Sequence, residues 1–330
     1  MGPGNQGLRL QARELNNLRE LNVRAVNILF ASTKEKPEFW FPLLQKALPA
    51  DRFFAWPDSN GGDIDVALVA THPKGVFSGL TRLKLIQSLW MGVENIIDDV
   101  ELPRGVPVAR LIDPGMVAAM GETVIAQVLD WHRHFYCYRQ FQQDRIWKRR
   151  RQYLASDRTI GLLGLGELGS SAAAKLRALD FNVAGWSRRP KKLDGVYCST
   201  DLDEILSRSD AVVCLLPLTP QTRGILNKDS IQKIKQGGCV INVARGGHVV
   251  IPDLLAALDA GHLAHAYLDV FEHEPLPADN PLWSHPGLTV TPHIAALSEP
   301  RTSVGKIAEN IERLRRGEAP LNTVDFAAGY

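Results

Sequence analysis

The chain has 330 residues, 45% of them apolar and 22% charged, with 38 lysines and arginines against 36 aspartates and glutamates. This composition is typical of an ordinary globular protein, and it excludes a disordered chain, a collagen and a disulfide scaffold. A formal charge of +2 gives no electrostatic reason to expect nucleic acid or a membrane as a partner, and the length predicts two domains.

Residues 1–22 differ from the rest of the chain. A glycine-rich start is followed by leucines interspersed with arginines and glutamates. This pattern favours a short amphipathic helix or an added extension, and Glu14 and Glu20 argue against a mitochondrial presequence, which would be poor in acids. We therefore treat these residues as an N-terminal extension.

The next part of the chain alternates short β-rich apolar runs with helix-length segments. Strands are expected at 26–30, 64–69, 85–89 and 106–111. This alternation is typical of βαβ units and predicts a parallel sheet.

The pattern changes near Met116 to one long helix, expected over 116–138. A basic stretch at 145–151, which contains Trp147, follows this helix. The turn-forming residues just before the helix predict a domain boundary at 114–116.

A second series of strands then begins. Six are expected, at 159–163, 182–186, 210–215, 239–243, 264–269 and 288–291. Six parallel strands make a complete dinucleotide-binding sheet. The fold class expected is therefore α/β, with two Rossmann-like or flavodoxin-like doubly wound parallel-sheet domains.

The last predicted helix, 298–316, lies beyond the second sheet. Its apolar stripe needs a partner, and we expect it to pack on the first domain (the stripe is Val304, Ile307, Ala308, Ile311 and Leu314). One domain would then comprise 23–115 and 298–330, and the other 116–297. The chain would cross twice between the domains, and we expect a cleft between them to hold the substrate.

The four cysteines indicate a reducing compartment. Cys137, Cys198, Cys214 and Cys239 are scattered and form no C-x-x-C pair, so we expect buried small hydrophobic residues rather than a redox site. The longest apolar run, 211–216, is far shorter than a membrane span, and no charged segment followed by an apolar core opens the sequence. We expect a cytoplasmic protein.

A glycine-rich loop follows the strand that ends at Leu163. It reads G-x-G-x-x-G between a strand and a helix, over Gly164, Leu165, Gly166, Glu167, Leu168 and Gly169. The first glycine permits the tight turn, the second lets the backbone approach a pyrophosphate, and the third allows close helix packing. This context predicts dinucleotide binding.

The end of the next strand predicts which dinucleotide. NAD-binding sequences carry an acid there for the ribose 2′-hydroxyl, whereas this chain has Ser187, Arg188 and Arg189. Guanidinium groups match phosphate oxygens in a two-pronged geometry, so the cofactor expected is NADP(H). The alternative, a solvated basic turn, does not account for the missing acid.

Polar residues follow three later strands, in the segments 243–247, 268–277 and 291–296. Together with 216–224, these segments resemble the signatures of the D-2-hydroxyacid dehydrogenase family, and the resemblance covers essentially 158–296. The stretch 281–283, the helix from Ser298 and the terminal 328–330 are similar to the bacterial glyoxylate/hydroxypyruvate reductase A branch of that family.

The resemblance implies specific residue roles. The family's arginine, acid and histidine correspond to Arg245, Glu274 and His293. It implies that Asp269 faces the nicotinamide, with capping of the following turn as the alternative. It also implies a homodimer, formed through the segment near 116–138 and Trp147. The remaining cofactor contacts that it implies are Leu216, Pro217, Thr222, Val243, Ala244 and Ala295.

The chemistry of these side chains fits the reduction of a 2-oxo acid. Arg245 offers a fork-shaped cation to the substrate carboxylate. His293 can protonate the carbonyl oxygen, because histidine titrates near neutrality. Glu274, if hydrogen-bonded to the other ring nitrogen, would fix the tautomer and favour the imidazolium. Taken singly, each of these residues could instead be an ordinary surface or loop residue.

The loop at Trp90, Met91 and Gly92 is where the sequence departs from the family, in which small residues are commoner. The resemblance implies that backbone N–H groups of this loop hold the substrate carboxylate. The bulky Trp90 and Met91 either shrink the pocket or pack beneath the loop.

Two further sequence patterns are weaker indications of a metal site and of a nucleic-acid contact. His262, His265, Asp269 and His273 could suggest a metal, but a turn separates the first two, so no metal is expected. The basic run 148–151 is better explained as a solvated face than as a nucleic-acid contact.

The predicted function is NADPH-dependent reduction of a small 2-oxo acid, either glyoxylate to glycolate or hydroxypyruvate to D-glycerate. One alternative is the same reaction on a larger 2-oxo acid. The other is a nucleotide-sensing corepressor or scaffold of the same fold, which the intact Arg245, Glu274 and His293 disfavour.

Overall fold

The computed structural model describes residues 24–326. The predicted N-terminal extension, 1–22, lies outside the described residues. The chain divides into two compact units: unit 1 comprises the residues up to Gly115 together with those from Ser298, and unit 2 is Met116–Leu297.

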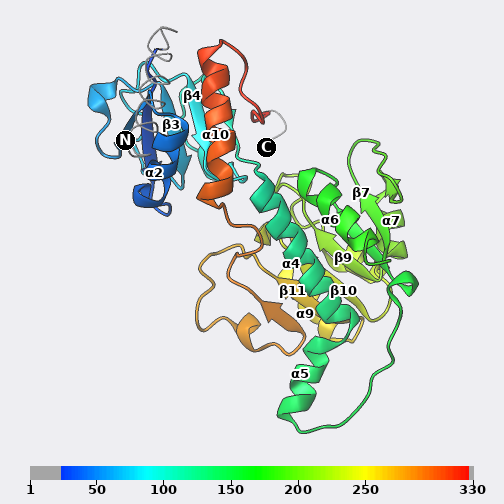
Figure 1. The fold of residues 1–330 in the computed structure, drawn as a ribbon. Coiled ribbons are helices and arrows are strands. Elements are labelled where there is room, and N and C mark those ends of the chain that lie inside the picture. The colour runs from blue at the N-terminus through cyan, green and yellow to red at the C-terminus, as the bar shows by residue number, and fades with distance from the viewer. Residues whose placement is uncertain (1–23, 327–330) are drawn as a thin grey trace, which may run out of the picture. The chain divides into compact units, whose positions relative to one another are not determined.

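Unit 1 is built on a five-stranded parallel sheet with the order β2-β1-β3-β4-β5 (Figure 1). This is the flavodoxin-like order. The strands are β1 (Asn27–Ser32), β2 (Arg52–Ala55), β3 (Val66–Ala70), β4 (Leu85–Ser88) and β5 (Val108–Ala109).

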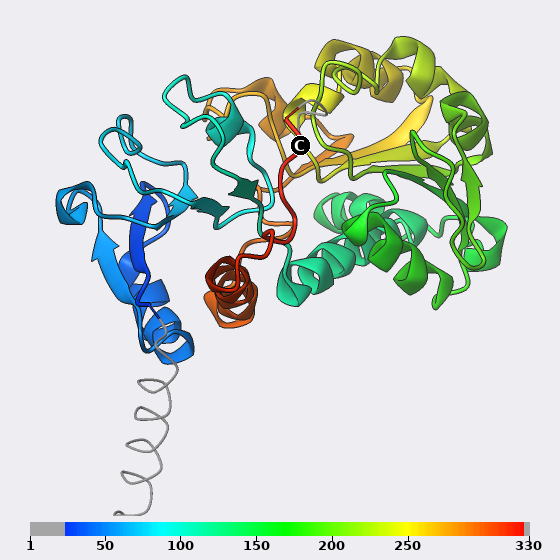
Figure 2. The ribbon, with the colours of Figure 1, turned by 90° about the horizontal axis from the view of Figure 1, so that it is seen from above.

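The two faces of this sheet are covered differently. Helices α2 (Pro37–Ala47) and α10 (Pro300–Arg315) lie on the same face (Figure 2), where Trp40 and Ile307 are fully buried. The other face is covered by the segment 76–83 and by α3 (Glu94–Ile97). The apolar stripe of α10 thus packs within unit 1.

Unit 2 contains a seven-stranded parallel sheet with the order β12-β11-β10-β9-β6-β7-β8. Helices cover both of its faces (Figure 2). The strands are β6 (Thr159–Leu163), β7 (Asn182–Trp186), β8 (Tyr197–Ser199), β9 (Ala211–Cys214), β10 (Gly238–Asn242), β11 (Leu263–Leu268) and β12 (Leu288–Val290).

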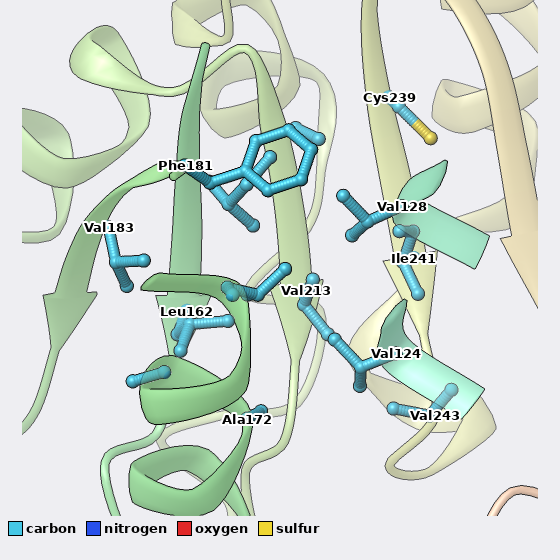
Figure 3. Close-up of a cluster of buried hydrophobic side chains, with 14 of the residues drawn as sticks. Val124, Val128, Leu162, Ala172, Phe181, Val183, Val213, Cys239, Ile241 and Val243 are labelled. Carbon is cyan, nitrogen blue, oxygen red and sulfur yellow. The ribbon is translucent and has the colours of Figure 1, made fainter. Parts of the chain in front are cut away.

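The helices of unit 2 bury their apolar sides against this sheet. Figure 3 shows Val124 and Val128 of α4 (Pro114–His132) facing Val213 and Ile241 of the strands. Helix α6 (Glu167–Arg177) packs on the same face as α4, and the opposite face carries α7 (Leu202–Arg208), α8 (Lys228–Lys233) and α9 (Ile251–Asp259).

The fold corrects the expected strand count. Strands β2 and β8 were not predicted, because both are edge strands of only 4 and 3 residues, exposed or half-buried, and so short a segment shows no periodicity. The strand expected at 106–111 is reduced to β5. Pro107, just before this strand, has no N–H to donate to a neighbouring strand, and the N–H of Arg110, just after it, donates to the Asn322 carbonyl.

The long helix expected at 116–138 is also corrected. Helix α4 ends at His132, and His134 adopts a left-handed conformation with φ of 60°. The chain then forms a separate helix, α5 (Phe135–Gln143), none of whose residues is buried. A left-handed residue interrupts the i to i+4 hydrogen-bond ladder, so the apolar periodicity continues across the break while the helix does not.

The prediction that the cysteines are buried is confirmed for two of the four. Cys214 and Cys239 are buried in β9 and β10, whereas Cys137 on α5 and Cys198 on the edge strand β8 are half-buried. All four are free thiols. Among residues 24–326, no helix combines the length and hydrophobicity that crossing a bilayer requires.

Candidate active site

The glycine loop between β6 and α6 has the conformation that its sequence predicts. Gly164 has a φ of 102°, which favours glycine. A Cβ on Gly169 would lie 1.9 Å from the Gly164 carbonyl oxygen, so only glycine lets the helix approach the loop. A Cβ on Gly166 would meet no atom within 4 Å. The cradle is therefore open at the helix start, where N–H groups can face an anion.

The side chains of the other residues of this loop pack against the protein or lie on its surface. Leu165 is buried, and its side chain lies beside β7, in the space that a Cβ on Gly185 would need. Glu167 is exposed in the first turn of α6, and Leu168 packs partly against the buried cluster. The part of the loop that is open to a ligand is thus its backbone.

The basic turn after β7 lies next to the glycine loop. Arg188 and Arg189 are exposed, and the Ser187 hydroxyl donates to the Arg189 carbonyl at 2.8 Å. The Lys191 ammonium donates to the Leu165 carbonyl, which joins the turn to the loop. Lys191 was not among the predicted site residues, although its place in the basic run could have indicated it.

Glu274 and His293 are in direct contact. Glu274 Oε2 lies 2.7 Å from His293 Nδ1, and Glu274 Oε1 accepts the Phe271 N–H at 2.9 Å. The histidine side chain is 48% exposed and the glutamate side chain 33% exposed. The pair is thus partly open to solvent, and Glu274 occupies the Nδ1 side of the ring.

Asp269 shapes the loop that carries His293. Its buried carboxylate accepts the Thr291 hydroxyl at 2.6 Å and the Ile294 and Ala295 N–H groups at 2.9 Å each. The Asp269 carbonyl accepts the His293 N–H at 2.8 Å. These bonds run to the loop after β12 and not to the turn directly after Asp269, so both expected roles of Asp269, facing the nicotinamide and capping the next turn, stay predictions. Thr291 was missed, because a threonine at a strand end carries no distinctive signal.

Arg245 follows β10, two strands away from β12 in the sheet. Its Nη1 donates to the Ala244 carbonyl at 2.7 Å, and the residue is half-buried. Two buried residues that the sequence did not single out hold this turn. Asn242 donates to the Arg245 carbonyl at 2.9 Å, and the His248 ring contacts the Arg245 backbone and the Pro217 carbonyl. A polar side chain at the end of a fully buried strand could have indicated Asn242.

The remaining predicted cofactor residues lie at the same sheet edge. Leu216 and Pro217 follow β9, where the Thr222 hydroxyl donates to the Pro217 carbonyl at 2.8 Å. Val243 and Ala244 follow β10 and are buried. Ala295 is buried against the α4 side of the sheet, and its carbonyl accepts the Thr123 hydroxyl at 3.1 Å. In a parallel sheet the carboxyl ends of the strands form the ligand edge.

The predicted substrate loop lies in unit 1, directly after β4. Trp90 N–H donates to the Ser88 hydroxyl at 3.0 Å, so this group is already bonded. Within residues 24–326, the N–H groups of Met91 and Gly92 show no hydrogen-bond partner. The Trp90 ring packs against the α2 side of the sheet, which matches the expectation that it packs beneath the loop.

The histidines considered as metal ligands from the sequence make other contacts in the structure. His262 bonds the Ile231 carbonyl, and His265 bonds the Thr289 hydroxyl at 2.8 Å and stacks on Tyr136. In the part of the chain that the structure describes, no group of three or more His, Cys, Asp or Glu side chains could hold a metal ion.

Comparison with known proteins identifies the class. The family model of the D-isomer specific 2-hydroxyacid dehydrogenase NAD binding domain matches residues 125–295. The chain belongs to this family and is an oxidoreductase with an NAD-binding domain. The resemblance and the fold class that the sequence indicated are confirmed.

Individual relatives are similar over nearly the whole chain. Glyoxylate/hydroxypyruvate reductase A of Serratia proteamaculans (strain 568) is 40% identical over 313 residues, which cover 92% of this chain and 100% of the relative. A D-isomer specific 2-hydroxyacid dehydrogenase from Xanthobacter autotrophicus Py2, solved with NADPH and MES, has a TM-score of 0.89 and 39% identity, covering 93% of this chain and 100% of that one. The NADPH-dependent glyoxylate/hydroxypyruvate reductase of Sinorhizobium meliloti, solved with NADP and sulfate, has a TM-score of 0.86 and 35% identity, covering 92% and 100%.

Proposed function

We propose that the protein reduces glyoxylate to glycolate and hydroxypyruvate to D-glycerate with NADPH. The observation that carries this proposal is the contact of 2.7 Å between Glu274 and His293 at the ligand edge of a nucleotide-binding sheet. The Serratia relative, whose name states this activity, supports it. Because the chain is an oxidoreductase, we do not pursue the corepressor alternative.

Residues 116–297 are assigned as the NADP-binding domain. The residues present fit this cofactor: Gly166 has open space before it, and the exposed Arg188 and Arg189 replace the acid that would repel a 2′-phosphate. The Xanthobacter and Sinorhizobium relatives, solved with NADPH or NADP, support the assignment. When bound, NADPH supplies the hydride.

His293 is assigned as the general acid. Glu274 accepts a hydrogen bond from Nδ1, which leaves Nε2 as the atom that gives its proton to the carbonyl oxygen of the substrate. The contact with Glu274 also fixes the orientation of the ring. Asp269 keeps the His293 loop in place through its bonds to the backbone.

Substrate recognition is assigned to both units. Arg245 binds the substrate carboxylate with its guanidinium. Residues 23–115 and 298–330 are assigned as the substrate domain, where the unpaired Met91 and Gly92 N–H groups of the loop that begins at Trp90 are available to an anionic substrate. These two kinds of donor suit a short, anionic 2-oxo acid.

We also propose a cytoplasmic homodimer. The four free cysteines support a reducing compartment. The second copy would cover the apolar residues that follow α5, of which Trp147 is 98%, Leu154 70% and Ile146 47% exposed. A monomeric mass by light scattering at micromolar concentration would contradict the homodimer.

The test of the function is a steady-state assay of purified protein with NADPH or NADH against glyoxylate, hydroxypyruvate and a panel of larger 2-oxo acids. We expect the highest kcat/KM for the two small acids with NADPH. The matched control is His293→Ala, which should lower kcat by ~10²–10⁴ without changing NADPH binding. A preference for a larger 2-oxo acid would favour the alternative substrate, and a fully active His293→Ala would contradict the mechanism.

A further inference from the structure

The Glu35 carboxylate connects two tryptophans in unit 1. Oε1 accepts the indole N–H of Trp90 at 2.8 Å, and Oε2 accepts that of Trp40 at 3.1 Å. The Glu35 N–H donates to the Ser32 hydroxyl at 2.8 Å, so the residue is held at the end of β1. Both carboxylate oxygens are therefore engaged, one with helix α2 and one with the predicted substrate loop.

The backbone around Trp90 is fully bonded. Leu89 N–H donates to the Val69 carbonyl at 2.8 Å, and the Leu89 carbonyl accepts the Ser298 hydroxyl at 2.7 Å. Trp90 N–H donates to Ser88, and the Trp90 carbonyl accepts the Leu111 N–H at 3.0 Å. Met91 and Gly92 thus carry the first N–H groups of the loop that remain available to a ligand.

The position of the Trp90 side chain allows it to anchor the loop to the rest of unit 1. Its ring packs against the buried cluster formed by the sheet, α2 and α10, and its N–H points to Glu35. A hydrogen bond to a charged acceptor is stronger than a neutral one, and a partly buried one is screened less by water. The bond to Glu35 therefore restricts the rotation of the indole and, through it, the backbone that leads into Met91.

We propose that Glu35 is a positioning residue for substrate binding: it holds Trp90 so that the Met91 and Gly92 N–H groups are preorganised for the carboxylate of a 2-oxo acid. This inference rests on the proposed function. Trp90 then acts as an anchor of the loop and not as a wall of the pocket. Because every 2-oxo acid has the same carboxylate, loss of the anchor weakens all of them by the same factor.

The experiment compares two tryptophans that share one acceptor. Trp90→Phe removes the bond to the loop, and Trp40→Phe removes the bond to α2. We expect Trp90→Phe to raise KM roughly 5- to 20-fold for both glyoxylate and hydroxypyruvate with little change in kcat, since one charged hydrogen bond is lost. Trp40→Phe should leave KM unchanged. Because Trp40 is fully buried and Trp90 is not, Trp40→Phe should lower Tm more.

Glu35→Ala tests whether Trp90 acts through Glu35. The single variant should raise KM about as much as Trp90→Phe, and the double variant should add nothing further, because both remove the same interaction. Hydrogen exchange at the Trp90 amide, which is bonded to Ser88, and at the Leu111 amide, which is bonded to the Trp90 carbonyl, should rise in Trp90→Phe and Glu35→Ala but not in Trp40→Phe. This last readout requires no substrate.

Several results would overturn the inference. A changed ratio of the two KM values in Trp90→Phe would make Trp90 a pocket wall. An equal rise of KM in Trp40→Phe, additive effects in the double variant, or unchanged amide exchange would remove the positioning role of Glu35. If the wild-type protein reduces neither acid, the proposed function fails, and the amide exchange still decides whether Glu35 anchors the loop.

Discussion

Glu274 and His293 are nineteen residues apart in the chain, yet Glu274 Oε2 lies 2.7 Å from His293 Nδ1. They follow β11 and β12, which are neighbours in the sheet. The Nδ1 side of the histidine is thereby occupied, and the opposite nitrogen is the one that we propose for the substrate. This pairing makes a specific prediction about the Glu274→Gln variant.

Glu274→Gln should lower kcat for glyoxylate reduction, by less than His293→Ala does, and leave NADPH binding unchanged. The carboxylate can only accept the hydrogen bond from Nδ1, whereas the amide that replaces it can also turn its NH2 group towards the ring, so the orientation of the ring is less well fixed. The measurement is kcat and the Kd for NADPH in the wild type and the variant; equal kcat values would contradict the pairing.

Replacement of Arg188 and Arg189 by alanine should weaken NADPH selectively. Loss of charged hydrogen bonds to a 2′-phosphate should raise the KM for NADPH roughly 10- to 100-fold. NADH lacks this phosphate, so its kinetics in the same variant are the internal control and should change little. Wild-type protein that already prefers NADH would rule out the assignment.

Two glycines of one loop should respond differently to alanine. In Gly169→Ala the new Cβ would lie 1.9 Å from the Gly164 carbonyl oxygen, so we expect a loss of about 1–3 kcal/mol in the free energy of unfolding. In Gly166→Ala the Cβ meets no protein atom within 4 Å, so Tm should be unchanged while the KM for NADPH rises. Thermal unfolding and NADPH titration separate the two; equal losses of Tm would refute the distinction.

His265 should make stability depend on pH. Burial lowers the pKa of this histidine from 6.5 to about 4 in the folded protein. Between these values the unfolded state binds the extra proton, so the free energy of unfolding falls as the pH falls from 6.5 towards 4, by up to roughly 3 kcal/mol.

His265→Phe is the matched variant, because it removes the titrating group and retains a ring to stack on Tyr136. Urea unfolding at several pH values should show a smaller dependence on pH in the variant than in the wild type. Equal slopes in the two proteins would show that His265 does not contribute.

The sequence by itself predicted the class of fold and indicated where in the fold the candidate site residues lie. Inner strands such as β6 and β7 were predicted with the bounds that the structure has, because their central residues are buried and form a short apolar run. The glycine loop could be identified because its three roles depend on local spacing alone. The segments that carry Arg245, Glu274 and His293 were singled out because strand ends in a parallel sheet form its ligand edge, and the resemblance to the family then pointed to these three residues.

Only the tertiary structure decided features that depend on partners distant in the chain. The edge strands β2 and β8 pair with β1 and β7, and with 4 and 3 residues both are too short to show a pattern of their own. The orientation of Trp90 depends on Glu35, 55 residues earlier, and the His293 loop depends on Asp269 and Thr291. Hydrogen bonds between distant residues have no periodicity in sequence, so their geometry appears only when the chain is folded.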